Sequence, residues 1–172
     1  NNAAGAGAAA PEVPRDAGAG KKAVLIDHMD SFVHMLANYL RQTGAEVTTV
    51  RYDRITAARL AALRPDFVVL SPGPGKPSDF DVSATLAACV ELRLPVFGVC
   101  LGLQSIVEHF GGTLAVLDYP MHGKPSTMRV AEGAPRPALF DGIPDAITVA
   151  RYHSLYGVRE RVPRHAQLQP YA

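Results

Sequence analysis

Between Lys21 and Gly112, short and largely apolar segments alternate with segments whose apolar residues recur at helical spacing. The apolar segments, each expected to form a strand, are KAVLID, AEVTTVR, DFVVL and PVFGVC. The helical segments are residues 31–42, residues 56–63, the stripe of Val82, Leu86, Cys89 and Val90, and residues 103–110. In the first of them, Phe32, Leu36 and Leu40 are expected to share the buried face. Strands that are apolar on both sides need cover on both faces. The alternation therefore predicts an α/β fold with an open, mostly parallel, doubly wound sheet in a three-layer sandwich.

The pattern changes at both ends of this region. After residue 112, the short strand candidates TLAVL, STMRV and AITVA are separated by Pro and Gly, which predicts a small antiparallel extension at one edge of the sheet. Before it, twelve of the first twenty residues are Ala or Gly. Residues 1–20 are therefore expected to be a flexible linker, and residues 21–172 a single domain.

Composition narrows the classes of function. Seventeen basic against sixteen acidic residues leave a net charge of +1, which gives no electrostatic footprint for nucleic acid or an anionic membrane. Two cysteines are too few for a disulfide scaffold or a zinc cluster. No apolar run approaches the roughly 20 residues that span a bilayer. We expect a cytoplasmic domain with no metal or cofactor, whose partners are small molecules or protein.

The segment GVCLG, residues 98–102, joins an apolar strand directly to a helix and has Cys100 at the turn. This is the pattern of a nucleophile elbow, in which a strained turn exposes the central side chain and flanking glycines let neighbouring elements approach. The helix N-terminus is expected to lower the pKa of the Cys100 thiol, and the Leu101 amide to face a developing oxyanion. The alternative, a buried structural cysteine, fits Cys89 better because Cys89 lies in an apolar helical stripe.

A second segment, LSPGPGKPSDF at residues 70–80, follows a strand directly. Ligands of doubly wound sheets bind at the carboxyl ends of strands. Two glycines held between prolines can bring backbone amides close to a substrate oxygen and supply the second half of an oxyanion hole. Taken alone, the segment fits an ordinary turn before a helix equally well.

Five ordered blocks, LIDHMDSF, LSPGPG, PVFGVCLGLQSI, PMHGKPS and RYHSLYG, resemble the triad (class I) glutamine amidotransferases, and among them the glutaminase component of anthranilate synthase. The resemblance implies a flavodoxin-like fold and a Cys100 nucleophile that forms a γ-glutamyl thioester and releases ammonia. It implies L-glutamine as substrate and a chorismate-using synthase as partner, in tryptophan biosynthesis. The residues expected to bind glutamine or its oxyanion are Gly73, Pro74, Gly75, Leu101, Gln104, Ser154 and Leu155.

Two other positions in these blocks have a structural interpretation. Asp30 is expected to be the N-cap of the helix that starts at Ser31, in preference to a catalytic carboxylate. In the resembling family the region of PMHGKPS tends to face the partner synthase, but His122 and Lys124 fit a solvated turn equally well.

The resembling proteins continue into an HPE block whose His is the general base and whose Glu orients it, and this sequence contains no HPE. The domain is therefore expected to be incomplete at its C-terminus. The histidine nearest to the site by family position is His153, which belongs to the glutamine-binding block and is not expected to act as base. Without the base, we expect little or no glutaminase activity from the chain alone.

The Ala, Gly and Pro tract before the fold is what a junction with an upstream synthase domain would look like, so the resemblance favours a fused anthranilate synthase. Three alternatives stay open. The glutaminase of aminodeoxychorismate or phenazine synthesis has almost the same residues. A non-catalytic module would keep the fold and dock on a synthase, but it would not hydrolyse glutamine. An unrelated cysteine hydrolase would share only the elbow.

Overall fold

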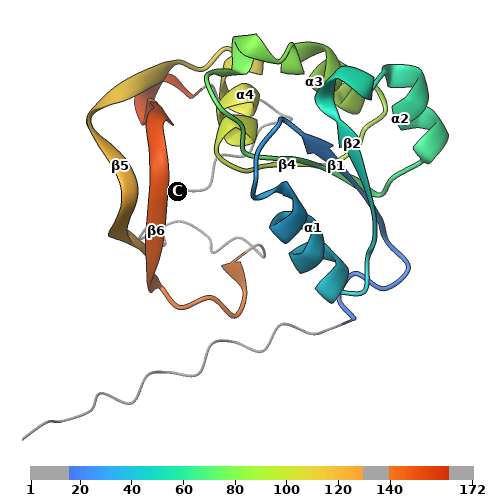
Figure 1. Ribbon diagram of the computed structural model, residues 1–172, viewed down its shortest axis with the longest axis horizontal. Helices are drawn as coiled ribbons and strands as arrows, with labels where there is room; N and C mark the ends of the chain where they lie inside the picture. The colour runs from blue at the N-terminus through green and yellow to red at the C-terminus, as the bar shows by residue number, and fades with distance from the viewer. Residues whose placement is uncertain (1–15, 130–139, 163–172) are drawn as a thin grey trace, which may run out of the picture.

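The computed structural model describes residues 16–129 and 140–162. Its centre is a parallel four-stranded sheet in the order β2-β1-β3-β4 (Figure 1). The strands are β1 (Lys22–Asp27), β2 (Glu46–Arg51), β3 (Phe67–Leu70) and β4 (Val96–Gly98). Crossover helices cover both faces, which confirms the predicted three-layer, doubly wound flavodoxin-like architecture.

The two sheet faces carry two separate apolar clusters. Helix α1 (Val33–Gln42) covers one face, where Val33 and Ala37 pack against Leu25 and Val69. Helices α2 (Ala57–Leu63), α3 (Val82–Glu91) and α4 (Leu101–His109) cover the other. That larger cluster includes Val24, Ile26, Val68, Leu70, Leu60, Leu86, Cys89 and Ile106. Cys89 is fully buried in it, as its place in the apolar stripe predicted.

The start of α1 differs from the prediction. The helix begins at Val33, so Phe32 lies before it and is 51% exposed, although it was expected on the buried face with Leu36 and Leu40. Asp30 is not the helix N-cap either. Its Oδ1 accepts the Phe32 N–H at 2.8 Å, which closes a local turn ahead of the helix. Leu36 and Leu40 are half-buried on this face as expected, and its fully buried members are Val33 and Ala37 instead of Phe32.

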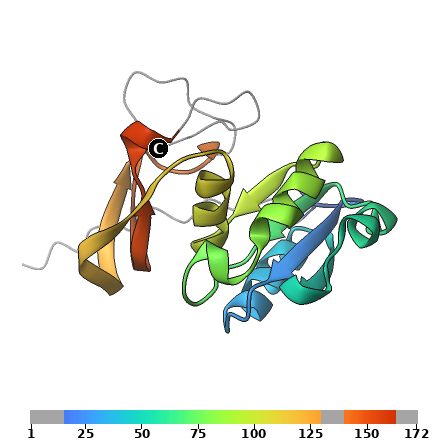
Figure 2. The same ribbon diagram turned by 90° about the horizontal axis from the view of Figure 1, so that it is seen from above.

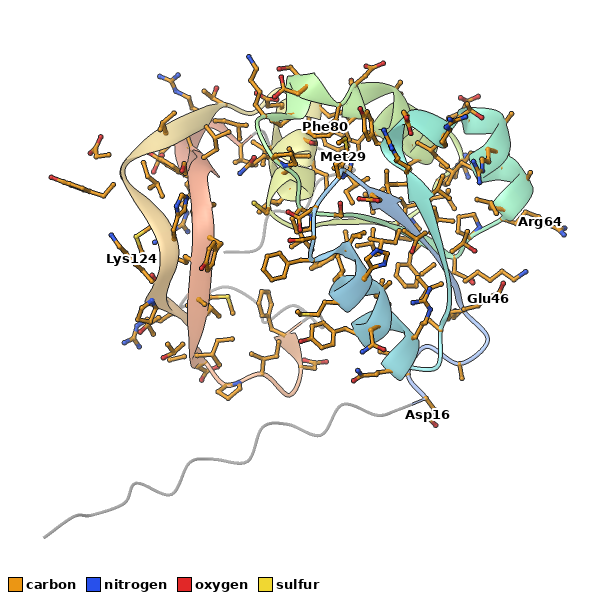
Figure 3. All side chains as sticks on the ribbon, in the orientation of Figure 1. Asp16, Met29, Glu46, Arg64, Phe80 and Lys124 are labelled. Atoms are coloured by element: carbon orange, nitrogen blue, oxygen red, sulfur yellow. The ribbon has the colours of Figure 1, made fainter. Side chains whose placement is uncertain are left out.

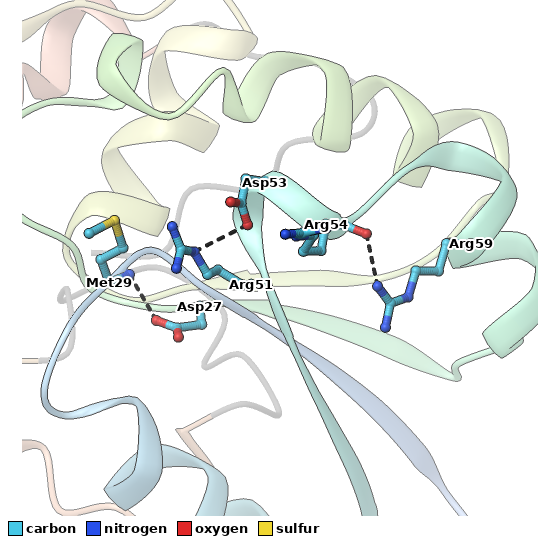
Figure 4. Close-up of polar contacts among 6 residues, drawn as sticks. All are labelled: Asp27, Met29, Arg51, Asp53, Arg54 and Arg59. Atoms are coloured by element: carbon cyan, nitrogen blue, oxygen red, sulfur yellow. Dashed lines mark hydrogen bonds and ion pairs between the residues drawn. The ribbon is translucent and has the colours of Figure 1, made fainter.

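The loops at the carboxyl ends of β1 and β2 are fixed by short polar contacts (Figure 4). Met29, with φ of 62°, donates its N–H to Asp27 Oδ1 at 2.8 Å, which stabilises a left-handed turn residue. Arg51 Nε lies 3.2 Å from Asp53 Oδ1 in the 3-10 helix η1 (Tyr52–Arg54). These contacts set the backbone at the sheet end where α/β folds bind ligands.

Strands β5 (Leu114–Arg129) and β6 (Ala146–Gly157) form a separate two-stranded antiparallel sheet, here called the arm. The antiparallel pairing was predicted, but a place at the edge of the parallel sheet was wrong: in both ribbon views the arm stands beside α4 (Figures 1 and 2). Gly157 packs against Val107 of α4, and Val158 N–H donates to Thr113 O at 2.9 Å. The pairing has register shifts at residues 116–121 and 122–124, and the second of them is at Gly123.

Part of the expected linker belongs to the folded body. Gly18 is buried, and its N–H donates to Thr43 O at 2.7 Å, beside the end of α1. Residues 1–15 of that linker lie outside the described part of the chain, as does Val130 of STMRV. Across residues 16–129 and 140–162, no helix has both the length and the apolarity needed to cross a bilayer.

Candidate active site

Cys100 sits at a strained turn between β4 and α4. Its φ of 52° and ψ of −108° lie in a region that non-glycine residues rarely adopt. The turn is held on both sides: Val99 N–H donates to Leu70 O at 3.0 Å, and Cys100 O accepts the Gln104 N–H at 3.0 Å. The chain thus leaves the sheet after Gly98, and Cys100 forms the elbow that the sequence pattern predicts.

The flanking glycines permit this turn because no side chain fits beside them. A Cβ on Gly98 would lie 2.5 Å from the carbonyl carbon of Gly102, and a Cβ on Gly102 would lie 2.6 Å from Leu70 Cβ. The strand, the elbow and the helix therefore pack backbone against backbone. This close packing fixes the direction in which the Cys100 side chain leaves the turn.

The thiol environment differs from the expected one. Partial burial raises the pKa of the Cys100 thiol, the Leu101 N–H opposes this by hydrogen bonding, and the nearby negative charge of Asp30 raises it further. Cys100 Sγ lies 3.9 Å from Tyr152 O of β6. The prediction of a lowered pKa is therefore wrong, because desolvation and the Asp30 carboxylate outweigh the amide at the helix N-terminus.

The glycine loop, residues 73–75, faces this elbow from the end of β3. Gly75 adopts φ of 70°, which a glycine accepts without strain. Behind it, Asp79 of η2 (Pro77–Asp79) accepts the Lys76 N–H at 3.0 Å and closes the loop. Gly73 lies against His28 and the Leu101 side chain. A larger residue does not fit there, because a Cβ at this position would lie 2.9 Å from His28 Cβ.

Elbow, loop and arm border an open pocket of about 210 Å³. The residues that line it are Gly73, Gly75, Cys100, Gln104, His122, Tyr152, His153, Ser154 and Leu155. Most of the residues expected at a glutamine site are thus brought together from three separate parts of the chain. Pro74 is exposed and does not line the pocket, and the Leu101 side chain is buried. Leu101 instead takes part through its backbone amide at the Cys100 thiol.

Three lining residues, His122, Tyr152 and His153, were not among the expected site residues. His122 and Tyr152 are paired across the arm, and their rings stack with centroids 6.0 Å apart and planes 8° from parallel. His122 had been interpreted as either a partner-facing residue or a solvated turn. Its place at the pocket depends on the pairing of β5 with β6 across a bulge, and that long-range register has no local signal in the sequence.

His153 is held in one orientation by two neighbours. Its Nε2 accepts the Arg151 Nε–H at 2.9 Å, and its Nδ1 lies 2.9 Å from Leu155 O. A carbonyl only accepts, so the ring proton is on Nδ1, and the lone pair on Nε2 is already engaged. His153 therefore has no free lone pair with which to take a proton from Cys100, in agreement with the expectation that it is not the base.

Comparison with known proteins gives one consistent family. The family model described as "Glutamine amidotransferase class-I" matches residues 24–169. The chain is 58% identical over 161 residues to "Anthranilate synthase" of Azospirillum brasilense, covering 94% of this chain and 21% of that protein. It is 41% identical over 140 residues to "Anthranilate synthase component 2" of Pseudomonas putida, covering 81% of this chain and 69% of that protein.

A solved structure with the same fold is that of a putative GMP synthase protein from Thermoplasma acidophilum. It superposes with a TM-score of 0.70 at 25% identity, covering 84% of this chain and 69% of that one. The chain therefore spans about a fifth of its Azospirillum relative and about two thirds of the Pseudomonas and Thermoplasma proteins. Fold, elbow and family model agree, and the chain belongs to the class I glutamine amidotransferases.

Proposed function

We propose that this chain carries the glutamine-hydrolysing site of an anthranilate synthase, with Cys100 as the nucleophile. The observation that carries the proposal is the strained Cys100 elbow facing the glycine loop, with both lining one pocket of about 210 Å³. The 58% identity to the Azospirillum brasilense anthranilate synthase supports the choice of pathway.

In the proposed reaction, the Cys100 thiolate attacks the side-chain carboxamide carbon of glutamine. The new C–S bond pushes the carbonyl electron pair onto oxygen, and amides of Leu101 and the glycine loop stabilise that negative charge. When the pair returns, the C–N bond breaks and the nitrogen takes up a proton to leave as ammonia. Water then hydrolyses the thioester to glutamate and restores the thiol.

The arm is suited to hold the amino-acid end of the substrate. Gln104 Nε2 donates to Leu155 O at 3.2 Å, so its amide oxygen remains available to accept from an ammonium group. Ser154 and Leu155 line the same side of the pocket. We infer that these three residues bind the α-amino and α-carboxyl groups, while Gly73 and Gly75 lie at the reacting end.

Proton transfer is the weak step for this polypeptide alone. The lone pair of His153 is engaged by Arg151, and the sequence contains no HPE block. General acid–base help is typically worth about 10² to 10⁴ in rate. We infer that the isolated chain forms the thioester slowly and turns over glutamine far below the rate of a family member that has the block.

The test is covalent labelling with a chloroketone analogue of L-glutamine, followed by intact mass and peptide mapping. We expect one adduct on Cys100, formed faster than with iodoacetamide, slowed by free L-glutamine, and absent in Cys100→Ser. The D-enantiomer is the control for recognition of the amino-acid end. Buried Cys89 gives an internal measure of non-specific reaction. Labelling no faster than that of an ordinary thiol, or unaffected by glutamine, would instead support a non-catalytic docking module.

The acceptor is tested separately by combining the amidotransferase, supplied as a full-length protein, with chorismate-using synthases that accept ammonia. Fluorescent anthranilate formed from chorismate and glutamine is the expected product. Aminodeoxychorismate formation, with no anthranilate, would overturn the pathway assignment and leave the Cys100 chemistry intact.

A further inference from the structure

His28 is a buried polar residue outside the pocket lining. It follows β1, is 1% exposed, and had no expected role in the sequence. Its backbone N–H donates to Ser71 Oγ at 2.9 Å, and its Nδ1 lies 3.2 Å from both the Oγ and the carbonyl oxygen of Ser71. Two groups of one residue thus converge on the residue that follows β3. A buried polar cluster of this kind fixes a unique backbone arrangement when every member is satisfied.

The contacts continue from Ser71 into the glycine loop. Ser71 Oγ donates to Pro72 O at 2.6 Å, so the hydroxyl links His28 to the residue just before Gly73. Gly73 itself lies against His28: a Cβ there would come 2.9 Å from His28 Cβ and 3.0 Å from His28 O. His28 therefore holds the backbone ahead of the loop through hydrogen bonds, and it holds Gly73 through direct packing.

The imidazole is held rigidly in turn. The Phe80 ring meets it edge-on at 5.5 Å, and the Tyr52 ring stacks near it at 6.4 Å. Phe80 and Tyr52 also pack edge to face, 4.8 Å apart. Figure 3 labels Phe80, together with Met29, at this end of the sheet. Burial lowers the pKa of His28, which keeps the ring neutral, and the neighbouring Ser71 carbonyl selects the tautomer with its proton on Nδ1.

We propose that His28 is a positioning residue that holds the glycine loop, through Ser71 and Pro72, at the distance from Cys100 that a developing oxyanion requires. The inference rests on the proposed function of Cys100 and the loop. It assigns to the start of the β1–α1 connection a part in the reaction, although no atom of His28 lines the pocket. A misplacement of about 1 Å at such a site can cost on the order of 10²-fold in rate.

The test compares His28→Leu with His28→Asn in the full chain. Leu and Asn both branch at Cγ, but only Asn carries a nitrogen at the same number of bonds from Cβ as Nδ1. We expect His28→Leu to slow chloroketone labelling of Cys100 by about 10-fold or more, because the ketone oxygen loses its fixed partners. Iodoacetamide, which needs no oxyanion site, is expected to react within about 2-fold of the parent rate, and His28→Asn to restore most of the selective rate.

Ser71→Ala is the second variant, because it cuts the same link from the other side and removes only a hydroxyl. His34→Leu on the exposed side of α1 is the control for loss of an imidazole. Equal slowing by both reagents, or no rescue by Asn, would reduce His28 to a packing residue and overturn the proposal.

A readout independent of glutamine separates this inference from the proposed function. Amide hydrogen exchange at residues 71–76 is expected to rise in His28→Leu and Ser71→Ala, and to stay at the parent level in His28→Asn. If the parent chain shows no glutamine-directed labelling, the proposed function fails and exchange still decides whether His28 orders the loop. Unchanged exchange in both disruptive variants would overturn the inference.

Discussion

Gln104 on α4 and Leu155 on β6 are joined by a hydrogen bond of 3.2 Å from the side-chain amide to the backbone carbonyl. The same carbonyl lies 2.9 Å from His153 Nδ1, so one oxygen fixes both a helix side chain and an arm side chain. The parallel sheet and the arm share no strand pairing in the described residues. Contacts made by α4 are therefore what places the arm over Cys100.

Gln104→Leu should loosen this arrangement without creating a cavity, since the two side chains are close in size. One hydrogen bond is worth about 1 kcal/mol, and the Leu155 carbonyl keeps its bond with His153 Nδ1, so the cost stays small. We expect glutamine protection of Cys100 against the chloroketone to weaken by about 10-fold, with a small loss of thermal stability. Gln42→Leu, at the exposed end of α1, is the matched control and should leave protection unchanged.

Burial is the main cause of the raised pKa of Cys100, and Asp30 adds to it. Its negative charge raises the pKa of the thiol, so Asp30→Asn should lower that pKa and move the pH profile of iodoacetamide labelling to lower pH. Asn keeps an oxygen that can accept the Phe32 N–H, so the local turn is retained. Asp27→Asn, which alters the neighbouring turn at Met29, is the control. A profile that moves equally in both variants would mean that the charge of Asp30 has no specific effect.

The sequence predicted the parts of the site that depend on local chemistry. Cys100 was found because an apolar strand, two glycines and a helix surround it, and the strained φ of 52° follows from that pattern. The bounds of β1 match the apolar segment KAVLID, and α3 contains the predicted stripe of Val82, Leu86, Cys89 and Val90. The sign of the Cys100 pKa shift was missed because burial, the Leu101 amide and Asp30 all contribute to it. Asp30 is far from Cys100 in the sequence, and only the fold brings its charge near the thiol.

Long-range pairing accounts for the other misses. His122 and Tyr152 meet because β5 and β6 pair with two register shifts, and a shift of one residue reverses the side to which each side chain points. Phe32 was expected to be buried because the helix was started two residues early, and the Asp30 turn that delays it is closed by a side chain. Such turns compete with helix starts wherever Asp or Ser occurs.

Gly102→Ala tests the close packing of the elbow. The new methyl would be 2.6 Å from Leu70 Cβ and would also meet the Leu70 backbone, so α4 or β3 must move. Overpacking of this kind typically costs about 1–3 kcal/mol. We expect a corresponding fall in the urea midpoint and a loss of selective Cys100 labelling. Gly157→Ala, where the nearest atom to a new methyl is 3.4 Å away, should be close to neutral. A neutral Gly102→Ala would show that the elbow tolerates a wider spacing.

Cys89 should make the chain less stable at alkaline pH. Burial in the core raises the pKa of its thiol to about 11, above the ordinary value of 9.0. Between these two values the unfolded chain has lost the proton and the folded chain keeps it, so the folded state binds more protons. The free energy of unfolding therefore falls as pH rises from about 9 towards 11, and the full contribution of Cys89 is present only below pH 9.

Cys89→Ala should lose stability at neutral pH through the cavity it leaves, but its further loss between pH 9 and 11 should be smaller than that of the parent. Urea unfolding followed by circular dichroism at pH 7, 9 and 10.5 measures both effects, and parallel pH curves for the two proteins would show that Cys89 ionises equally easily in the folded chain.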